Sequence, residues 1–282
     1  MSNNRVGNAD LTLHSINSRN HKVIKRVRRL RRRTFRDREG MFLVEGVTLV
    51  QEAVSSGARL TELLYVNSRS EEAGLITSEV GRQLLCYEIS QDLMEWVSDV
   101  VTSQGILGVL EQVDIEYEDV LSREISLLLI ADQVRDPGNL GALVRIADAV
   151  GVDGFMLTAG CADLYNPKVV RAAAGSHFHM PLVRNVNMAR LKNDLASRGM
   201  KLLGLDARGD MSYLDAGLDG RTALVVGNEA FGISEEDREL LDGSVHIPMP
   251  GKAESLNVAT AAGIVLFEAL RQICVRNRGE KE

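Results

Sequence analysis

Hydrophobic and polar positions along this chain form two blocks of short alternating elements. In the first block, strand-length apolar runs occupy residues 42–44, 63–66, 84–89 and 106–111, and helical spacing occupies residues 47–55 and 91–97. Before them, Val23, Val27 and Leu30 recur at i, i+4 and i+7, which predicts an amphipathic helix over residues 22–33. The first block is therefore predicted to be a small α/β domain over residues 14–111.

The second block carries a stronger version of the same alternation. Strands are predicted at residues 126–131, 154–158, 180–183, 201–206, 222–227 and 245–248, with helices at 140–150, 169–174, 188–197, 235–241 and 256–275. Strands separated by helices predict a mostly parallel sheet that helices cover on both faces. The last helix is apolar on nearly every side, which predicts that it is buried all round.

Polar stretches set the expected boundaries of the domains. Residues 1–13 are polar and aperiodic, so they are predicted to be a flexible tail. Residues 112–124 are rich in acids and lack a strong period, so they are predicted to be a linker. The second domain is then expected over residues 125–282, and a chain of 282 residues has ample material for two buried cores.

Composition narrows the class of protein. A hydrophobic share of 45% with 26% charged residues is ordinary for a globular protein. The three cysteines are far apart and outside any CxxC, which favours reduced thiols in a cytoplasmic protein. No apolar run approaches the roughly 18 residues of a membrane span, so no membrane partner is expected.

The charge of the chain is unevenly distributed. The formal net charge is −6, yet eleven Lys and Arg residues and a single acid lie between Arg19 and Arg38. Such a concentration of cations on an acidic protein favours a local anionic partner, and RNA phosphate is preferred over a merely solvated helix face. The candidate RNA-binding residues here are Lys22, Lys25, Arg28, Arg29, Arg31 and Arg32.

Three segments rich in Asn, Gly and Pro follow predicted strands of the second domain: residues 136–145, 226–234 and 247–257. The carboxyl ends of strands are where open α/β sheets place their ligands, so the three together predict a ligand site. A Rossmann GxGxxG, a phosphate-binding P-loop and a hydrolase GxSxG are all absent. The five histidines do not form a convincing ligand set, and no metal is expected; His177 and His179 are predicted on a strand.

The same three segments resemble the signature motifs of the SpoU-type (TrmH-like) RNA ribose 2′-O-methyltransferases of the SPOUT superfamily. The similarity covers roughly residues 126–275 and is carried in order by Asn139…Arg145, by Gly227-Asn228-Glu229…Gly232, and by Ile247-Pro248-Met249…Ser255-Leu256-Asn257. The first block, with Ser18-Arg19-Asn20…Lys25 and Phe42-Leu43-Val44-Glu45-Gly46, resembles the ribosomal-protein-like substrate-binding domain that many members carry.

The resemblance implies a fold, a cofactor and a substrate. The fold would be an α/β-knot domain with a C-terminal trefoil knot, the methyl donor S-adenosylmethionine and the acceptor a ribose 2′-hydroxyl of structured RNA. Ribosomal RNA, and 23S rRNA in particular, is preferred over transfer RNA, and a non-catalytic RNA-binding assembly factor is the alternative from another class. Family members dimerise through the last helix, so a homodimer is expected.

The resemblance also assigns roles to individual residues. Gly227, Ile247 and Leu256 match the family's backbone contacts to the cofactor, and Asn228 and Met249 lie beside them. The candidate catalytic residues are Arg145, Asn139, Glu229, Ser255 and Asn257.

Several of these roles have alternatives that the sequence leaves open. Arg145 is expected to orient the ribose or a phosphate and to stabilise charge on oxygen, since a guanidinium stays protonated, with a surface salt bridge as the alternative. Glu229 either accepts a proton or fixes its loop. Ser255 either holds a loop or caps the last helix. Arg171 either contacts a phosphate or is an ordinary surface arginine.

Overall fold

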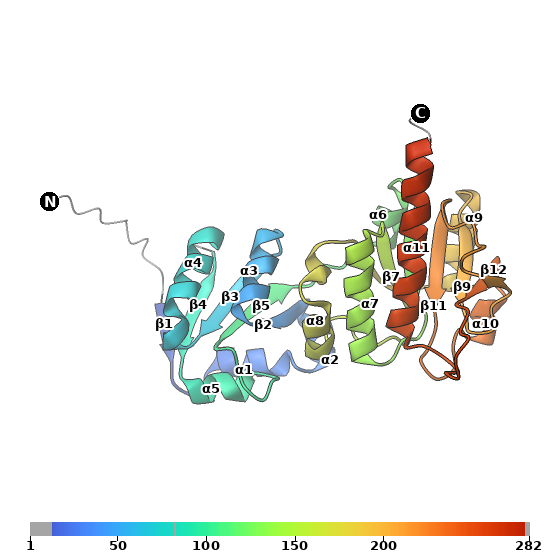
Figure 1. Ribbon diagram of the computed structural model, residues 1–282. Coiled ribbons are helices and arrows are strands. Elements are labelled where there is room, and N and C mark those ends of the chain that lie inside the picture. Colours follow the sequence, from blue (N-terminus) through green and yellow to red (C-terminus); the bar gives the residue numbers. More distant parts are fainter. Residues whose placement is uncertain (1–12, 82, 280–282) are drawn as a thin grey trace. The chain divides into compact units, whose positions relative to one another are not determined.

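The computed structural model describes residues 13–81 and 83–279, and the chain divides into two compact units, residues 1–112 and 113–282 (Figure 1). The predicted tail, apart from the backbone of its last residue, lies outside the described residues.

The first unit is built on a five-stranded sheet in the order β1-β4-β3-β5-β2. Its strands are β1 (Leu13–Ile16), β2 (Met41–Glu45), β3 (Leu60–Tyr65), β4 (Leu85–Ile89) and β5 (Ile106–Glu111). Its helices are α1 (Lys22–Arg29), α2 (Arg33–Glu39), α3 (Val47–Ser55), η1 (Asn67–Arg69), α4 (Ser70–Val80) and α5 (Gln91–Val97). Strands β1, β4 and β3 run parallel, whereas β5 is antiparallel to both β3 and β2.

The basic segment forms two helices, so the prediction of a single helix through residue 33 is wrong. Helix α1 ends where Leu30 is buried, and the N–H groups of Arg31 and Arg32 bond only three residues back. The carbonyl of Leu30 accepts a hydrogen bond of 2.7 Å from the guanidinium of Arg36, which is 2% exposed. A buried arginine therefore holds the break, which a pattern of apolar residues cannot show.

The second unit is built on a seven-stranded sheet in the order β10-β12-β9-β11-β6-β7-β8, in which every pair is parallel. Its strands are β6 (Leu127–Ala131), β7 (Gly154–Thr158), β8 (Leu182–Val186), β9 (Lys201–Leu205), β10 (Met211–Ser212), β11 (Thr222–Val226) and β12 (Gly243–His246). Its helices are α6 (Tyr117–Leu121), α7 (Pro137–Val150), α8 (Pro167–Ala173), η2 (Ser176–Phe178), α9 (Met188–Ser197), α10 (Glu235–Arg238) and α11 (Val258–Gly279). The predicted α/β class with a mostly parallel sheet is confirmed, whereas the trefoil knot stays a prediction.

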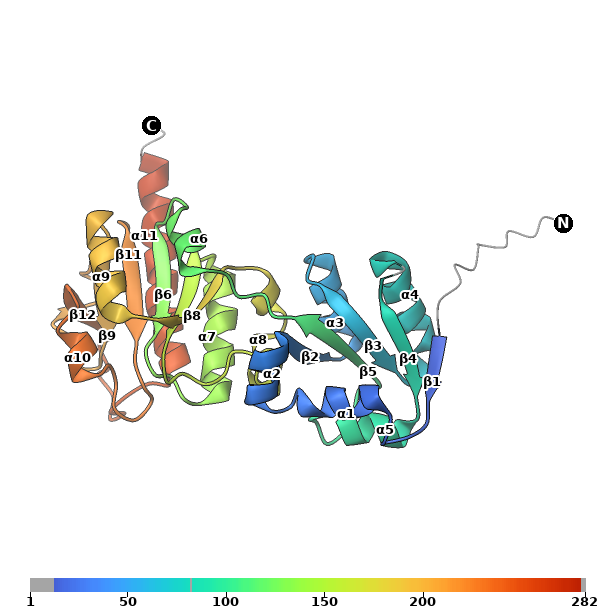
Figure 2. The same ribbon diagram turned by 180° about the vertical axis from the view of Figure 1, so that it is seen from behind.

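Helices cover both faces of this sheet. Helices α7 and α11 pack side by side on one face, where Ile146 lies against Gly263 (Figure 1). Helices α6 and α9 cover the other face, and their apolar residues form one core with alternate residues of β6, Leu128 and Ile130 (Figure 2). From β6 the chain runs outward through β7 and β8 and then crosses to β9 on the other side of β6, and ligand crevices form where the strand order reverses in this way.

The segment predicted as a linker, residues 112–124, belongs mostly to the second unit. Helix α6 lies within it, and Val120 and Leu121 are buried in the core beside Leu128. The hydroxyl of Tyr165 accepts hydrogen bonds of 2.8 Å from the backbone N–H groups of Val113 and Asp114. The acids alternate with the few apolar residues that face the sheet, so the sequence pattern predicted a linker here instead of a helix.

Helix α11 differs from its prediction in two ways. It begins at Val258 rather than at residue 256, and Phe267 and Val275 are 50% and 56% exposed, so it is not buried all round. By length and composition it is apolar enough to cross a membrane, contrary to the sequence expectation, with a window of mean hydropathy 1.6. One such helix is weak evidence, because core helices pass the same test, and Val265 and Leu266 of α11 are buried in the fold.

The two histidines predicted on a strand lie elsewhere. His177 is in the short helix η2 and His179 follows it, since β8 begins only at Leu182. His177 is buried, which lowers the pKa of its ring to about 4, and its Nε2 lies 2.9 Å from the carbonyl oxygen of Leu164. Within the described part of the chain, no group of three His, Cys, Asp or Glu side chains is placed to hold a metal ion.

Candidate cofactor site

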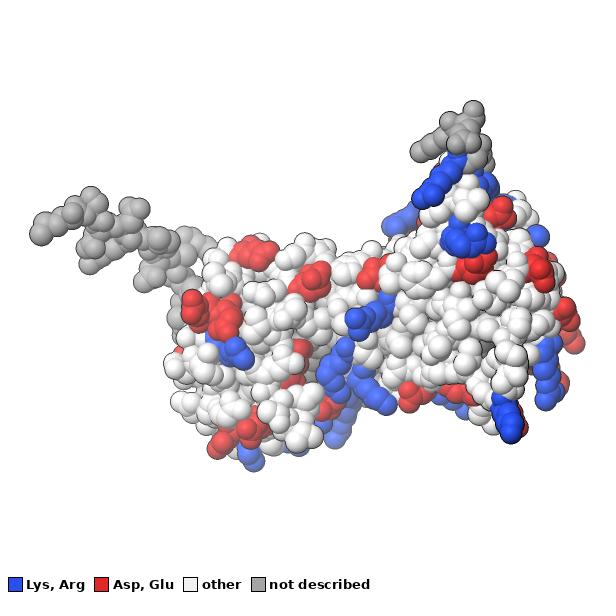
Figure 3. Space-filling view, viewed as in Figure 1, with Lys and Arg blue, Asp and Glu red and all other residues white. Residues whose placement is uncertain are grey.

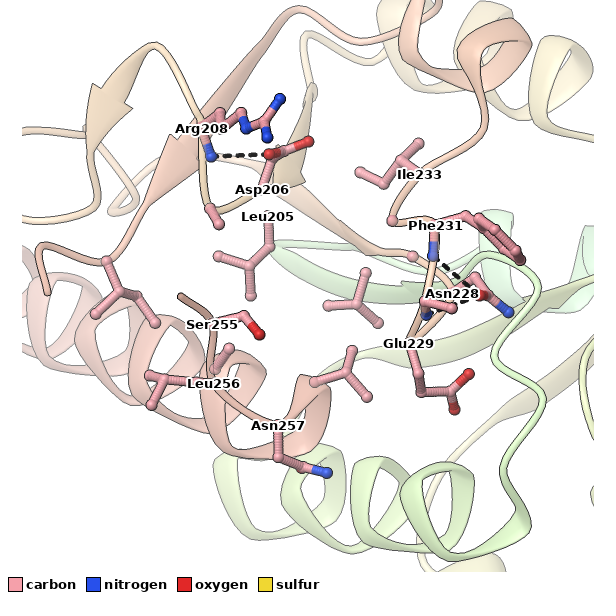
Figure 4. Close-up of a pocket in the computed structure, with 18 of the residues that line it drawn as sticks. Leu205, Asp206, Arg208, Asn228, Glu229, Phe231, Ile233, Ser255, Leu256 and Asn257 are labelled. Carbon is pink, nitrogen blue, oxygen red and sulfur yellow. Dashed lines mark hydrogen bonds between the residues drawn. The ribbon is translucent and has the colours of Figure 1, made fainter. Parts of the chain in front are cut away.

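A cavity of about 830 Å³ opens where β9 and β11 end, beside the segment that leads from β12 into α11 (Figure 4). Its volume lies within the range of roughly 300–1,000 Å³ that small-molecule sites have. All three of the segments singled out by the sequence contribute to its wall: Asn139, residues 226–233, and Ile247, Met249 and residues 255–258.

The wall of the cavity is partly apolar and partly polar. Leu205, Val226 and Ile247 line it together with the polar side chains of Asp206 and Ser255, and Figure 4 shows the Ser255 hydroxyl directed toward the open space. Apolar surface with a few placed polar groups suits a ligand that joins an aromatic base to charged parts, as S-adenosylmethionine does.

Asp206 is held as a carboxylate on this wall. Burial alone would raise the pKa of its carboxyl group, but hydrogen bonds outweigh this and lower it below its ordinary value. The donors are the backbone N–H of Arg208, at 2.8 Å, and the guanidinium of Arg238. A charged acceptor therefore faces a cavity whose other lining is partly apolar, which suits recognition of ligand hydroxyl or amino groups.

The loop after β11 is folded back on itself beside the cavity. Asn228 and Gly232 form an antiparallel bridge in which each N–H donates to the other's carbonyl at 2.9 Å. Gly227 lies against the far end of this loop, because a Cβ placed on it would come within 2.2 Å of the Gly232 carbonyl carbon. The side chain of Asn228 accepts from the N–H groups of Ala230 and Phe231 and donates to the carbonyl of Gln133.

A chain of side-chain hydrogen bonds ties the three segments together. Glu229 accepts from the amide of Asn139 at 3.1 Å, and the amide oxygen of Asn139 accepts from Asn257 at 2.7 Å. Asn257 in turn caps α11, because its oxygen accepts from the N–H groups of Ala259 and Thr260. Three residues far apart in sequence therefore fix the relative positions of the loops that form the wall.

The carboxylate of Glu229 accepts several hydrogen bonds, which does not suit a proton acceptor. Burial would raise the pKa of its carboxyl group, but hydrogen bonds from Asn139 and from the backbone N–H groups of Asp136 and Arg135 lower it. A carboxylate with a lowered pKa and occupied oxygens is a weak base. Of the two roles left open by the sequence, this geometry favours fixing the loop.

We expect Glu229→Gln to weaken cofactor binding several-fold at neutral pH, because one oxygen acceptor becomes an amide donor facing N–H groups. In the wild type the lowered pKa means that the carboxylate persists down to pH 4.5 and is lost only as the pH falls further. Calorimetric titration with S-adenosylmethionine between pH 5 and 8 should therefore show no titration from Glu229. If wild-type activity instead depends on a group that titrates near neutral pH, and Glu229→Gln lacks this pH dependence, then Glu229 acts as a general base.

The structure brings most of the predicted site residues to this cavity. All five candidate cofactor residues line it: Gly227, Asn228, Ile247, Met249 and Leu256. Of the candidate catalytic residues, Asn139, Glu229, Ser255 and Asn257 line it as well, whereas Arg145 does not. Ser255 is not the cap of α11, since Asn257 has that position.

Arg145 is an exposed residue of α7, next to the half-buried Ile146, which packs toward α11. Within the described residues its guanidinium has no hydrogen-bond or ion-pair partner, so the alternative of a surface salt bridge finds no support.

Several lining residues escaped the sequence analysis. Leu205, Asp206, Arg208 and Phe231 all contribute to the cavity. Asp206 follows a strand that the pattern did predict, so the rule that ligands meet strand ends could have found it. Phe231 lay inside a motif segment, but no pattern in one sequence separates an exposed aromatic from a buried one.

The candidate RNA-binding residues of the first unit are mostly available for a ligand. Lys22, Lys25, Arg28, Arg29 and Arg32 are exposed and, within the part of the chain described, none pairs with an acid. Arg28 also stacks over the ring of Trp96, at 3.8 Å from its centre. Arg31 differs, because its guanidinium binds Asp99 at 2.7 Å. Arg171 is exposed on α8 of the second unit.

Comparison with known proteins assigns this arrangement to a family. Residues 126–267 match the SpoU rRNA Methylase family, and residues 20–108 match the MRM3-like substrate binding domain. The chain belongs to the SpoU rRNA methylase family. The resemblance drawn from the motifs is thereby confirmed.

Individual relatives agree with the family over nearly the whole chain. The 23S rRNA (guanosine(2553)-2′-O)-methyltransferase RlmP of Bacillus subtilis is 35% identical over 90% of this chain and 98% of its own length. The SpoU methyltransferase AviRb of Streptomyces viridochromogenes, solved with the cofactor AdoMet, has a TM-score of 0.82 at 32% identity, covering 89% of this chain and 98% of that one. The AdoMet-bound rRNA methyltransferase of Sinorhizobium meliloti has a TM-score of 0.83 at 29% identity over 93% of this chain and 98% of its own.

Proposed function

We propose that this protein transfers a methyl group from S-adenosylmethionine to a ribose 2′-hydroxyl of 23S rRNA in the cytoplasm. The observation that carries the proposal is the cavity whose three walls are the family's signature segments, joined through Glu229, Asn139 and Asn257. Relatives over nearly the whole chain are named as 23S rRNA 2′-O-methyltransferases, and all three cysteines are free, which fits a reducing compartment.

The reaction requires positioning more than acid–base chemistry. S-adenosylmethionine, when bound, supplies a methyl group on a positively charged sulfur. Transfer needs the 2′-oxygen in line with that methyl group, so residues that fix the loops contribute by holding the two reactants in register. The hydroxyl oxygen becomes negatively charged as its proton passes to solvent, and a guanidinium is the group in this chain best suited to stabilise that charge.

We place Arg145 of a second subunit at this position. Arg145 is absent from its own cavity wall and is exposed on α7, the helix that packs against α11. On α11 Thr260 and Phe267 are exposed and Ile264 is half-buried, and the helix carries no charge before Glu268. Figure 3 shows the corresponding half of α11 as uncharged surface, with charges gathered toward its C-terminal end. We propose that a second copy covers this surface in a homodimer.

Incubation of the protein with tritiated S-adenosylmethionine and either 23S rRNA or transfer RNA, both transcribed without modification, tests the function. Label should enter 23S rRNA. The phosphodiester bond that follows the labelled ribose should resist alkaline cleavage, because its 2′-oxygen is methylated. Label in transfer RNA alone would support the other substrate. Absence of label in both, together with no heat on calorimetric titration of the cofactor, would indicate an RNA-binding protein without catalytic activity.

Removal of unpaired cations from α1 and the segment after it should weaken RNA binding. We expect the triple variant Lys25→Ala, Arg29→Ala, Arg32→Ala to reduce the steepness of log affinity against log salt by about 2 to 3. The reason is that binding releases fewer counterions when fewer phosphate contacts form. Filter binding of 23S rRNA between 50 and 300 mM salt measures it.

A control variant removes the same number of cations from the first unit. Arg33, Arg38 and Arg59 pair with Asp37, Glu39 and Glu111 respectively, and changing all three to Ala should leave the slope nearly unchanged. Equal slopes for the two triple variants would show that the slope follows net charge alone and would contradict a specific role of Lys25, Arg29 and Arg32 in RNA binding.

A further inference from the structure

Phe231 is the most exposed aromatic side chain among those the structure describes as large exposed hydrophobics. It is 85% exposed, and it lies on the rim of the cofactor cavity, in the loop between Gly227 and Gly232 (Figure 4). Isolated apolar residues on a surface usually need no explanation. This one combines full exposure with a position at the mouth of the ligand site.

The loop that carries Phe231 is held rigidly. Its two ends are joined by the paired backbone hydrogen bonds of Asn228 and Gly232, each 2.9 Å long. The N–H of Phe231 donates to the Asn228 side chain at 3.2 Å, and the preceding Glu229 is bound by Asn139. Gly232 has a φ of +71°, which lets the loop reverse immediately after the ring.

A preorganised aromatic ring loses little conformational freedom when it binds a flat partner. The ring of Phe231 is therefore presented to solvent at the rim of the cavity by a loop whose ends are joined by hydrogen bonds.

The proposed reaction supplies such a partner. A nucleotide that leaves the helical stack can bring its 2′-oxygen into a recessed cavity, and its base then lacks stacking partners. Aromatic side chains stack on such bases without regard to sequence. No other aromatic residue lines the cavity among the described residues.

We propose that Phe231 stacks on an unpaired nucleobase of the RNA substrate at the mouth of the cofactor cavity. This inference rests on the proposed function, because that function brings a nucleotide to the cavity. Phe231 is accordingly a residue that positions the acceptor and takes no part in holding the cofactor.

The test compares Phe231→Ala, Phe231→Leu and Phe231→Trp in steady-state methylation of unmodified 23S rRNA. Loss of one stacked base should raise KM for RNA by about tenfold or more in the Ala variant, with a smaller effect on kcat. Leu keeps the apolar volume but has no ring face, so it should resemble Ala, whereas Trp should restore the wild-type KM. Affinity for S-adenosylmethionine without RNA should stay within about twofold in all three variants.

Other outcomes would overturn the proposal. A wild-type KM in Phe231→Leu would mean that the contact with RNA is simply apolar. Reduced cofactor affinity would mean that the ring contacts the cofactor. Dissociation of the dimer in sedimentation would mean that the ring lies at a subunit interface. Each would leave the methyltransferase activity of the wild type intact. Failure of the proposed function is distinguishable, because then the wild-type protein itself would label no 23S rRNA.

A fluorescence measurement keeps the test independent of catalysis. Trp96 is the single tryptophan of the chain, so Trp96→Phe combined with Phe231→Trp places the only indole at the proposed site. Titration with a 20-nucleotide oligouridylate, whose bases are unpaired, should quench the emission of this variant in a saturable way. Unchanged emission at concentrations where filter binding shows complex formation would overturn the stacking proposal.

Discussion

A heterodimer with Arg145→Ala in one subunit and Gly227→Ala in the other should recover about half of the wild-type activity at low concentrations of S-adenosylmethionine, where each homodimeric variant should be nearly inactive. In this heterodimer, one site combines an intact cavity with the intact arginine of its partner. The prediction follows from the position of Arg145, which lies on α7 outside its own cavity wall. Two differently tagged subunits, expressed together and purified on both tags, provide the heterodimer for the methylation assay.

The matched control combines a wild-type subunit with a subunit that carries both substitutions. If Arg145 acts across the interface, the intact cavity in this heterodimer faces a partner without the arginine, and the protein should be inactive. If Arg145 acts within its own subunit, the pattern reverses: this heterodimer retains about half of the activity, and the first is inactive. The two heterodimers contain the same mutations, so differences in folding cannot produce the reversal.

The sequence predicted the parallel sheet and the cofactor cavity because both depend on features that are local in the chain. Strands such as β6 and β11 are uninterrupted apolar runs, as strands buried on both faces are. The motif segments follow these strands directly, and strands that run parallel bring their carboxyl ends to one edge. The predicted cofactor residues therefore converge without any knowledge of the loops between them.

Features set by long-range partners escaped the sequence pattern. The break between α1 and α2 depends on the buried guanidinium of Arg36, and the ordering of residues 113–121 depends on Tyr165. Likewise, one sequence cannot distinguish a helix buried all round from one with exposed apolar residues, as on α11. Arg145 shows the same limit. Its motif marks it as a candidate catalytic residue, but its position outside the cavity wall depends on the tertiary fold.

Gly227→Ala should weaken cofactor binding strongly while the protein still folds. The added Cβ would lie 2.2 Å from the carbonyl carbon of Gly232 and 2.3 Å from the nitrogen of Ile233. Both are backbone atoms, so no side chain can rotate away, and the loop must move as a unit. Overpacking of this kind costs about 1–3 kcal/mol, and here it displaces the bridge between Asn228 and Gly232. We expect the affinity for S-adenosylmethionine to fall by at least about tenfold in calorimetry.

Gly251→Ala is the control, because it adds the same methyl group to a segment that also borders the cavity. A Cβ at Gly251 meets no atom within 4 Å, so cofactor affinity and Tm should both match the wild type. For Gly227→Ala, a Tm lowered by only a few degrees alongside the lost affinity would locate the damage in the loop. Wild-type affinity in Gly227→Ala would mean that the loop moves without cost to cofactor binding. The hydrogen bonds of Asn228, Glu229 and Asn139 would then not be needed to hold the cavity wall in place.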